Sequence, residues 1–419
     1  MPEDSVLGYL RNGNGRPILT EDHAYSLEQI CQLGLRVAVR SIKGKLTAIN
    51  REEKYLLVNN KYKVYYDHLV ITTGLQYQPQ TKPTTEDTLT WREYIAKVSA
   101  GRKASSSIVL YGNNLDVYAA VGNLLEDGVR ASSIIVVLPE ATLNEETLGN
   151  TDDSVSAFGD PTLDQFLQSR MSQLGIRICS GYNLLNCEMQ AILLQTPVVH
   201  TVEFVRSHTD EKLTLPCLAL FCFHKKQVDH VLASAVNDAC LVFDSRLVVD
   251  TAFCTNDLAI RAGGPCTKLQ RIYLENAISH NHLNSCEVGL QLAETLLEIF
   301  HPKVLQAPKY HKDPIHILPM HTRPKIKGAF LPGGFHFLHV KKPRDVTKGR
   351  WMVTGEDKVD SQGLFKIHLD DKSKINELYI LTRSPIPAHN YMKLYDKPAV
   401  LVNNLESRYD EGLIDDFFE

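Results

Sequence analysis

The stretch that decides the fold is Tyr66–Gly74 (YDHLVITTG), where a run of branched apolar residues ends at a glycine. Such a run is typical of a strand that is buried on both faces of a parallel sheet. Before it, Leu46–Ile49 and Tyr55–Val58 flank a charged turn, and Tyr62–Tyr66 follows closely. We therefore expect a hairpin with a third strand, leading into a buried parallel strand.

The chain then alternates between strands and helices. Ser107–Tyr111 is typical of a buried strand and ends at Gly112, Leu115–Leu125 has apolar residues at helical spacing, and Ser133–Leu138 is a second apolar run. This order predicts a βαβ unit over residues 107–138. The pattern also predicts helices at 91–98, 163–174 and 288–299, and strands at 176–178, 198–205, 213–223, 247–250 and 258–260, with 198–205 paired to 213–223. We conclude an α/β fold with a mainly parallel sheet.

The composition changes after residue 301. Prolines recur through residues 302–332, which predicts an extended linker. Residues 333–419 form a β-rich module, with strands expected at 335–340, 350–354, 363–369 and 378–382. Residues 303–350 carry eleven Lys and Arg against two Asp and Glu. They are either a solvated linker or a docking patch for an acidic protein such as tubulin, and we expect these basic residues to be solvent-exposed: Lys325, Lys327, Lys341, Lys342 and Arg344.

Composition excludes several classes of protein. A net charge of −4 gives no reason to expect nucleic acid as a partner. The longest apolar run, Leu213–Phe223, is about half of the ~20 residues that a membrane crossing needs, and no signal peptide is visible. The nine cysteines are scattered, without the density of a secreted disulfide framework, so a reducing, cytosol-like compartment fits best.

Several motifs resemble those of the FAD-dependent pyridine-nucleotide disulfide oxidoreductases. Tyr66–Gly74 resembles the Y-D-x-L-V-I-A-T-G segment that closes the first half of their flavin domain. Ile108–Val117 is placed like their second G-x-G-x-x-G, and Leu247–Gly264 like their closing T-S-x-P-x-I-Y-A-x-G-D. The resemblance implies a degenerate architecture of two dinucleotide-binding, Rossmann-like domains with a β-rich α+β C-terminal domain.

This resemblance sets the expected domain division. Residues 1–100 and 230–300 would form an incomplete flavin-like domain, into which an NAD(P)-like domain over residues 104–225 is inserted. A linker over residues 302–332 would then lead to a dimerisation-like domain over residues 333–419. The division requires Val70 and Ile260 to lie in one sheet.

The residues that bind cofactors in that family are largely missing. A glycine fingerprint works because the absent side chains let a pyrophosphate approach the backbone at a helix N-terminus. Here Gly112 remains, but Asn114 and Val117 stand at the second and third glycine positions, and Asp116 adds a negative charge. The position of the ribose-binding acid holds Leu138, with Glu140 two residues late.

The flavin motifs are reduced further. Gly264 replaces the closing aspartate, and the first glycine-rich unit is absent from the chain. We interpret five residues as a vestigial loop that binds no cofactor: Gly112, Asn113, Asn114, Gly263 and Gly264. Substituting Gly112 or Asn114 by alanine is expected to disturb a scaffold very little.

No catalytic or metal site is predicted. There is no C-x-x-C motif, and Cys217 and Cys222 lie on an apolar strand, away from a helix N-terminus that would activate a thiol. The histidines at positions 311, 316 and 321 recur every five residues, a spacing that matches no common zinc site.

The chain also resembles the C-terminal part of the cilia- and flagella-associated protein 61 family. The residues that carry this resemblance are Tyr66–Gly74, Tyr111–Tyr118, Thr255–Gly264 and Gly349–Asp357 (GRWMVTGED). It implies a non-catalytic component of the axoneme in the calmodulin- and radial-spoke-associated complex, which supports radial spoke assembly and motility. Other axonemal proteins and a second copy of the chain would be its partners. The alternative is a flavin-dependent NAD(P)H oxidoreductase whose first nucleotide-binding unit lies upstream.

Overall fold

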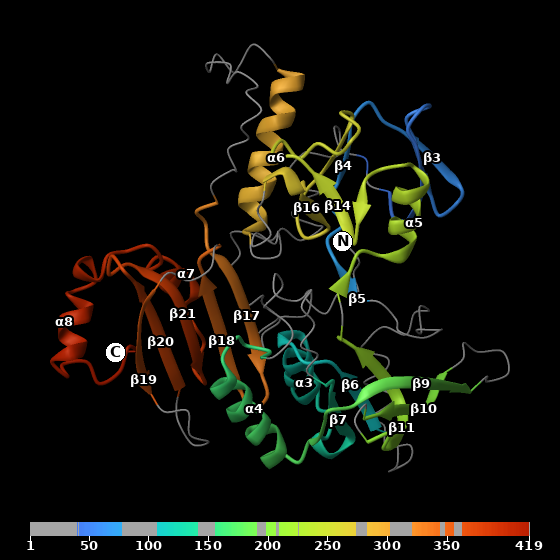
Figure 1. The fold of residues 1–419 in the computed structure, drawn as a ribbon. Coiled ribbons are helices and arrows are strands. Elements are labelled where there is room, and N and C mark those ends of the chain that lie inside the picture. Colours follow the sequence, from blue (N-terminus) through green and yellow to red (C-terminus); the bar gives the residue numbers. More distant parts are fainter. Residues whose placement is uncertain are drawn as a thin grey trace.

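The computed structural model describes residues 40, 42–77, 107–140, 156–190, 198–206, 209–224, 226–273, 283–301, 321–343, 348–355 and 363–418. Their strands form a six-stranded sheet, a five-stranded sheet and several smaller ones. The two large sheets lie on either side of two helices, α3 and α4 (Figure 1). In the described part of the chain, no helix is both long and apolar enough to span a membrane. The helix predicted at 91–98 lies outside the described residues.

The six-stranded sheet contains the predicted βαβ unit. Its order is β8-β7-β6-β11-β10-β9, with parallel pairing from β8 to β11 and antiparallel pairing from β11 to β9. The strands are β6 (Ser107–Tyr111), β7 (Ile134–Leu138), β8 (Arg177–Ser180), β9 (Asn183–Gln190), β10 (Val198–Val205) and β11 (Lys212–Cys222). The predicted pairing of β10 with β11 is confirmed, whereas β9 was not predicted.

Two helices cover one face of this sheet. Helix α3 (Leu115–Glu126) connects β6 to β7 through the short 3-10 turn η3 (Ala131–Ser133), and its residues 117–124 are all buried. Helix α4 (Pro161–Gln173) begins with a proline at its first position, where no backbone N–H is needed. Asp160 caps α4 by accepting a hydrogen bond from the N–H of Thr162.

Smaller sheets bring together the two segments that flank the six-stranded sheet in sequence. Strands β1 (Leu46–Asn50), β2 (Tyr55–Val58) and β3 (Tyr62–Tyr65) form the predicted antiparallel ribbon. Two further sheets join β5 (Gln76–Tyr77) to β12 (Lys226–Gln227), and β13 (Phe243–Asp244) to β14 (Arg246–Val249) and β16 (Thr267–Leu269). The helical elements here are α5 (His230–Asp238), η5 (Arg271–Tyr273) and α6 (Ser285–Phe300).

The key pairing is between β4 (Leu69–Ile71) and β15 (Ile260–Ala262), which are parallel, with Arg261 opposite Val70. The expectation that Val70 and Ile260 lie in one sheet is confirmed. The strand predicted at 258–260 begins later, at Ile260. Its N–H bonds to the carbonyl of Asp257, so residues 257–260 form a turn that leaves Leu258 exposed.

The C-terminal sheet is antiparallel and has the order β17-β18-β21-β20-β19. The strands are β17 (Lys325–Leu331), β18 (Phe335–Lys341), β19 (Gly349–Gly355), β20 (Gly363–Asp370) and β21 (Ile375–Thr382). Helix α7 (Ala388–Met392), the 3-10 turn η7 (Ala399–Leu401) and helix α8 (Leu405–Asp410) complete this part of the chain. Side chains from these elements pack against one face of the sheet around Phe365.

Strand β17 lies within residues 302–332, which the sequence predicted to be an extended linker, and this part of the prediction is wrong. Residues 325–331 were assigned to the linker because Pro324 and Pro332 flank them, but the prolines stand just outside a strand that pairs with β18 along its whole length. The expectation that the lysines are exposed is wrong for Lys325, Lys327, Lys341 and Lys342, which are half-buried in or beside this pairing. Arg344 lies outside the described residues.

One hydrophobic core is shared by the two large sheets. Ring centroids lie 5.1 Å apart for Phe158 and Phe337, and 5.4 Å apart for Phe166 and Phe335. Helix α3 approaches β17 so closely that a Cβ on Gly122 would lie 2.8 Å from the carbonyl oxygen of Phe330. Because burying one phenylalanine contributes about 1.5–3 kcal/mol, we conclude that this core holds the C-terminal sheet firmly against α3 and α4.

Candidate functional site

The loop between β6 and α3 is where a dinucleotide would approach the chain. Gly112 has a φ of 147°, and a Cβ at this residue would lie 2.8 Å from the carbonyl carbon and oxygen of Phe223. The backbone is also fixed on both sides, because the N–H of Gly112 bonds to Val137 and the N–H of Phe223 bonds to Tyr111. Gly112 is therefore required by the packing of the loop itself. The expectation that alanine is tolerated here is wrong.

Asn114 fills the space at the start of α3. Its Oδ1 accepts a hydrogen bond of 3.2 Å from the N–H of Val117, and its Nδ2 donates one of 2.5 Å to the carbonyl of Phe223. The side chain is buried. It thus uses a helix N-terminal N–H that a phosphate would otherwise bind. Replacing it by alanine would also leave the buried Phe223 carbonyl without this donor, so we now expect Asn114→Ala to lower the stability of the fold.

Asp116 is held by residues from two other strands. The ammonium group of Lys226, on β12, lies 2.5 Å from its carboxylate, and the hydroxyl of Tyr77, on β5, donates to the same oxygen. The Lys226 ammonium also lies 4.7 Å from the centre of the Tyr77 ring. The negative charge that the sequence predicted here is thus neutralised within the chain, by partners that the sequence did not indicate.

The remaining fingerprint positions are apolar or half-buried. Val117, at the third glycine position, is fully buried in the core shared by the two large sheets. Leu138 ends β7 inside the same core, and Glu140 follows it in a half-buried position. Asn113 is half-buried at the turn between Gly112 and Asn114.

The closing segment after β15 forms a turn at Gly263 and Gly264, without the carboxylate that the motif has there. The N–H of Gly263 bonds to the carbonyl of Ile71, and Thr267 donates both its N–H and its hydroxyl to the carbonyl of Gly264. Gly264 has a φ of 83°, and a Cβ built there would have no neighbour within 4 Å. The site of the missing aspartate is therefore open. Gly264 follows β15, which pairs with β4, whereas Gly112 follows β6 in the six-stranded sheet. The two halves of the predicted vestigial loop therefore lie at the ends of different sheets.

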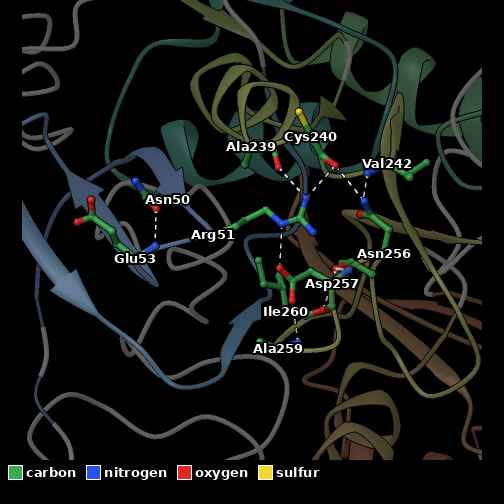
Figure 2. Close-up of polar contacts among 11 residues, drawn as sticks. Asn50, Arg51, Glu53, Ala239, Cys240, Val242, Asn256, Asp257, Ala259 and Ile260 are labelled. Atoms are coloured by element: carbon green, nitrogen blue, oxygen red, sulfur yellow. Dashed lines mark hydrogen bonds and ion pairs between the residues drawn. The ribbon is translucent and has the colours of Figure 1, made fainter.

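A polar network stabilises the turn before β15 (Figure 2). The guanidinium of Arg51, in the β1–β2 turn, donates to the Asp257 carboxylate at 2.8 Å and to the carbonyls of Ala239 and Cys240. Asn256 donates to the same Cys240 carbonyl. Because Ala239 and Cys240 end helix α5, Arg51 also supplies a positive charge at a helix C-terminus. These residues join the ribbon, the helix and the turn, which is a structural role.

The two cysteines with formal redox spacing lie in an apolar environment. Both are free thiols on β11. Burial raises the pKa of the Cys217 thiol to about 12 and also raises the pKa of Cys222. The thiolate, which is the reactive form, is therefore disfavoured at neutral pH.

The histidines lie in different surroundings. His311 and His316 fall outside the described residues. His339 on β18 bonds to Glu377 on β21 at 2.8 Å, and both are buried. Among the residues that the structure describes, no group of three His, Cys, Asp or Glu side chains could hold a metal ion.

Solved structures similar to this chain share its fold. They include reduced CoADR-RHD of Bacillus anthracis (TM-score 0.56, 14% identity, covering 96% of this chain and 66% of that one). LpdA of Mycobacterium tuberculosis gives a TM-score of 0.55 at 14% identity, and the alignment covers 90% of this chain and 74% of that one. An FAD-dependent pyridine nucleotide-disulphide oxidoreductase of Desulfovibrio vulgaris gives 0.50 at 14%, covering 88% and 90%. The predicted disulfide-reductase architecture is confirmed.

Two comparisons of sequence point to a ciliary protein. Residues 319–419 match the family model described as the CFAP61 dimerisation domain. Cilia- and flagella-associated protein 61 of Tetrahymena thermophila is 19% identical over 533 aligned positions, which cover 94% of this chain and 31% of that protein. The chain thus spans about a third of the length of this relative. The predicted resemblance to the cilia- and flagella-associated protein 61 family is therefore confirmed, in the C-terminal sheet by the family model and over most of the chain by the Tetrahymena relative.

Proposed function

We propose that this chain is a non-catalytic scaffold of the cilium or flagellum, in which a reductase fold is retained as a rigid body. The observation that carries the proposal is the loop at Gly112–Asp116. Asn114 uses the N-terminal N–H of α3 that a pyrophosphate would bind, and Asp116 forms an ion pair with Lys226, so the polar groups of this loop serve the fold. Function depends on sites and not on fold, so a loop whose polar groups bond within the chain supports a scaffold over an enzyme.

The resemblance supports a more specific place for the scaffold. A location in the axoneme, within the calmodulin- and radial-spoke-associated complex, would make the chain a support for radial spokes and motility. The match to a dimerisation domain supports self-association through residues 319–419. The lysines of β17 and β18 are half-buried, so a tubulin contact through the basic residues of 303–350 would use its other members, such as the exposed Arg323 and Lys348.

A second candidate is a flavin-dependent NAD(P)H oxidoreductase completed by an upstream unit. The open position at Gly264 favours it, because space remains where the closing motif of that family meets the flavin. The buried Val117 and the use of the N-terminal N–H of α3 by Asn114 count against it. A stoichiometric flavin absorbance of a longer chain, retained through gel filtration, would support this candidate.

Rescue of motility separates the two candidates. We would express the full natural protein with a fluorescent tag in ciliated cells that lack it, as wild type and with Glu140→Ala. Glu140 is the first carboxylate after β7, two residues past the position that binds the ribose in the family that the chain resembles, and it is half-buried. A scaffold should reach the axoneme and restore beating in both forms. A variant that reaches the axoneme without restoring beating would favour the enzyme.

A further inference from the structure

The C-terminal domain leaves three large apolar side chains in solvent beside α8. Val400 is 69% exposed, Leu401 is 75% exposed, and Leu413, just after α8, is 61% exposed. We propose that η7 and α8 form the surface through which this domain binds a second copy of the chain. This inference rests on the proposed self-association and names the surface that would carry it.

The backbone holds Val400 and Leu401 outward. Ala399, the first residue of η7, is buried, and its N–H bonds to the carbonyl of Ser373 at 2.8 Å. After η7 the chain reverses through Asn403 and Asn404, which have φ values of 56° and 51°. Asparagine tolerates left-handed backbone better than most non-glycine residues, so this pair forms the turn at little cost. The turn thus fixes two apolar residues at its outer end, where packing within one chain does not require them.

The platform beneath this turn is rigid. The Arg350 guanidinium donates to both carboxylate oxygens of Asp410, at 3.1 and 2.5 Å, and so ties α8 to β19. The hydroxyl of Tyr409 bonds to the N–H and the carbonyl of Val353, each at 3.1 Å. Ser373 donates to Glu406 at 2.7 Å. A surface that is already ordered loses little conformational entropy on binding, which favours a specific contact.

The position and charge of the surface fit a second copy. Figure 1 shows α8 at the outer end of the C-terminal sheet, far from the six-stranded sheet. The shared core covers the opposite face of the domain, so η7 and α8 remain accessible. Both signs of charge lie nearby: the basic residues Arg350, Lys374 and Arg408 stand among the more numerous Asp396, Glu406, Asp410, Glu411, Asp415 and Asp416. In a twofold contact each patch meets itself, and a mixture of signs lets it avoid like-charge repulsion.

Helix α6 offers the main competing surface. Leu290, Leu297 and Phe300 are exposed on it, at a spacing that places them along one side. The same side carries Glu294 and Glu298, and the helix contains no Lys or Arg. A second copy of α6 would therefore oppose like charges. The match to a dimerisation domain covers residues 319–419 and leaves α6 outside, so we assign the twofold contact to η7 and α8.

Sedimentation equilibrium of three variants tests the surface. We expect the wild-type chain to be a dimer, and Val400→Asp combined with Leu401→Asp to weaken dimerisation by about 30-fold or more, as for the central residues of an interface. Leu258→Asp is the matched control, because Leu258 is 78% exposed and lies near β15. It should remain dimeric. Leu290→Glu with Leu297→Glu tests α6 and should also remain dimeric.

Each outcome decides the proposal. Circular dichroism and urea unfolding of the double variant should match the wild type, since both side chains are exposed. A double variant that stays dimeric, or an α6 variant that becomes monomeric, would overturn the assignment to η7 and α8. A monomeric wild type would overturn self-association itself, while leaving the ciliary scaffold to the separate test of localisation and beating.

Discussion

The loop at Gly112–Asp116 and the closing segment at Gly263–Gly264 differ in two ways from the cofactor-binding motifs that they resemble. In the loop, Asn114 and Asp116 make hydrogen bonds and an ion pair inside the chain. In the closing segment a glycine stands where the motif has aspartate, and a Cβ built there would have no neighbour within 4 Å. The loop thus gains hydrogen bonds and an ion pair within the chain, whereas the closing segment only lacks a carboxylate. Substitutions should therefore cost stability in the loop and very little in the closing segment.

Gly112→Ala should have the largest effect. The new Cβ would meet the Phe223 backbone at 2.8 Å, at a φ of 147° that favours glycine. Backbone strain of about 1–3 kcal/mol and overpacking of about 1–3 kcal/mol predict a loss of about 2–6 kcal/mol in the free energy of unfolding. Urea denaturation followed by circular dichroism measures it. A loss under about 0.5 kcal/mol, the range of a neutral surface change, would show that the loop is not fixed as described.

Asn114→Ala should cost about 1–2 kcal/mol, because it removes a helix N-cap and a donor to the Phe223 carbonyl. Asn114→Ser is the matched control, since serine can still cap α3 and should recover about half of the loss. The same unfolding assay compares the two. Equal losses in both variants would mean that capping contributes nothing measurable.

Gly264→Asp restores the carboxylate of the closing motif and should cost about 1 kcal/mol or less, because aspartate tolerates left-handed backbone. Nothing within 4 Å opposes the new side chain. The purified variant should remain colourless, since the loop at Gly112–Asp116 is unchanged. A yellow protein with a stoichiometric flavin band would mean that one lost carboxylate was the main barrier to binding.

Lys226→Met should have the smallest effect, about 0.5 kcal/mol, because the lysine is partly exposed and Tyr77 still donates to Asp116. Salt should shrink the difference between variant and wild type, since it screens the lost attraction. Unfolding at low and high ionic strength checks this. A loss that is larger than that of Asn114→Ala would reverse the order of contributions within the loop.

Sequence patterns predicted the local elements well and the contacts between them poorly. The βαβ unit and the pairing of β4 with β15 followed from apolar runs that end at glycines. Strand β17 was missed because the prolines beside it obscured its pattern. The partners of Asn114 and Asp116 are Phe223 and Lys226, about 110 residues away in sequence. No local periodicity encodes such a contact, so these partners could be found only in three dimensions.

Calorimetric titration of NADH and NADPH into the purified chain tests the central claim most directly. If the polar groups of Asn114 and Asp116 serve only the fold, neither nucleotide should give a saturable heat of binding up to millimolar concentration. The lost backbone contacts, each worth about 1 kcal/mol, leave too little affinity to measure. A micromolar dissociation constant that Glu140→Ala weakens at least tenfold would contradict the account, because it would place a working dinucleotide site at this loop.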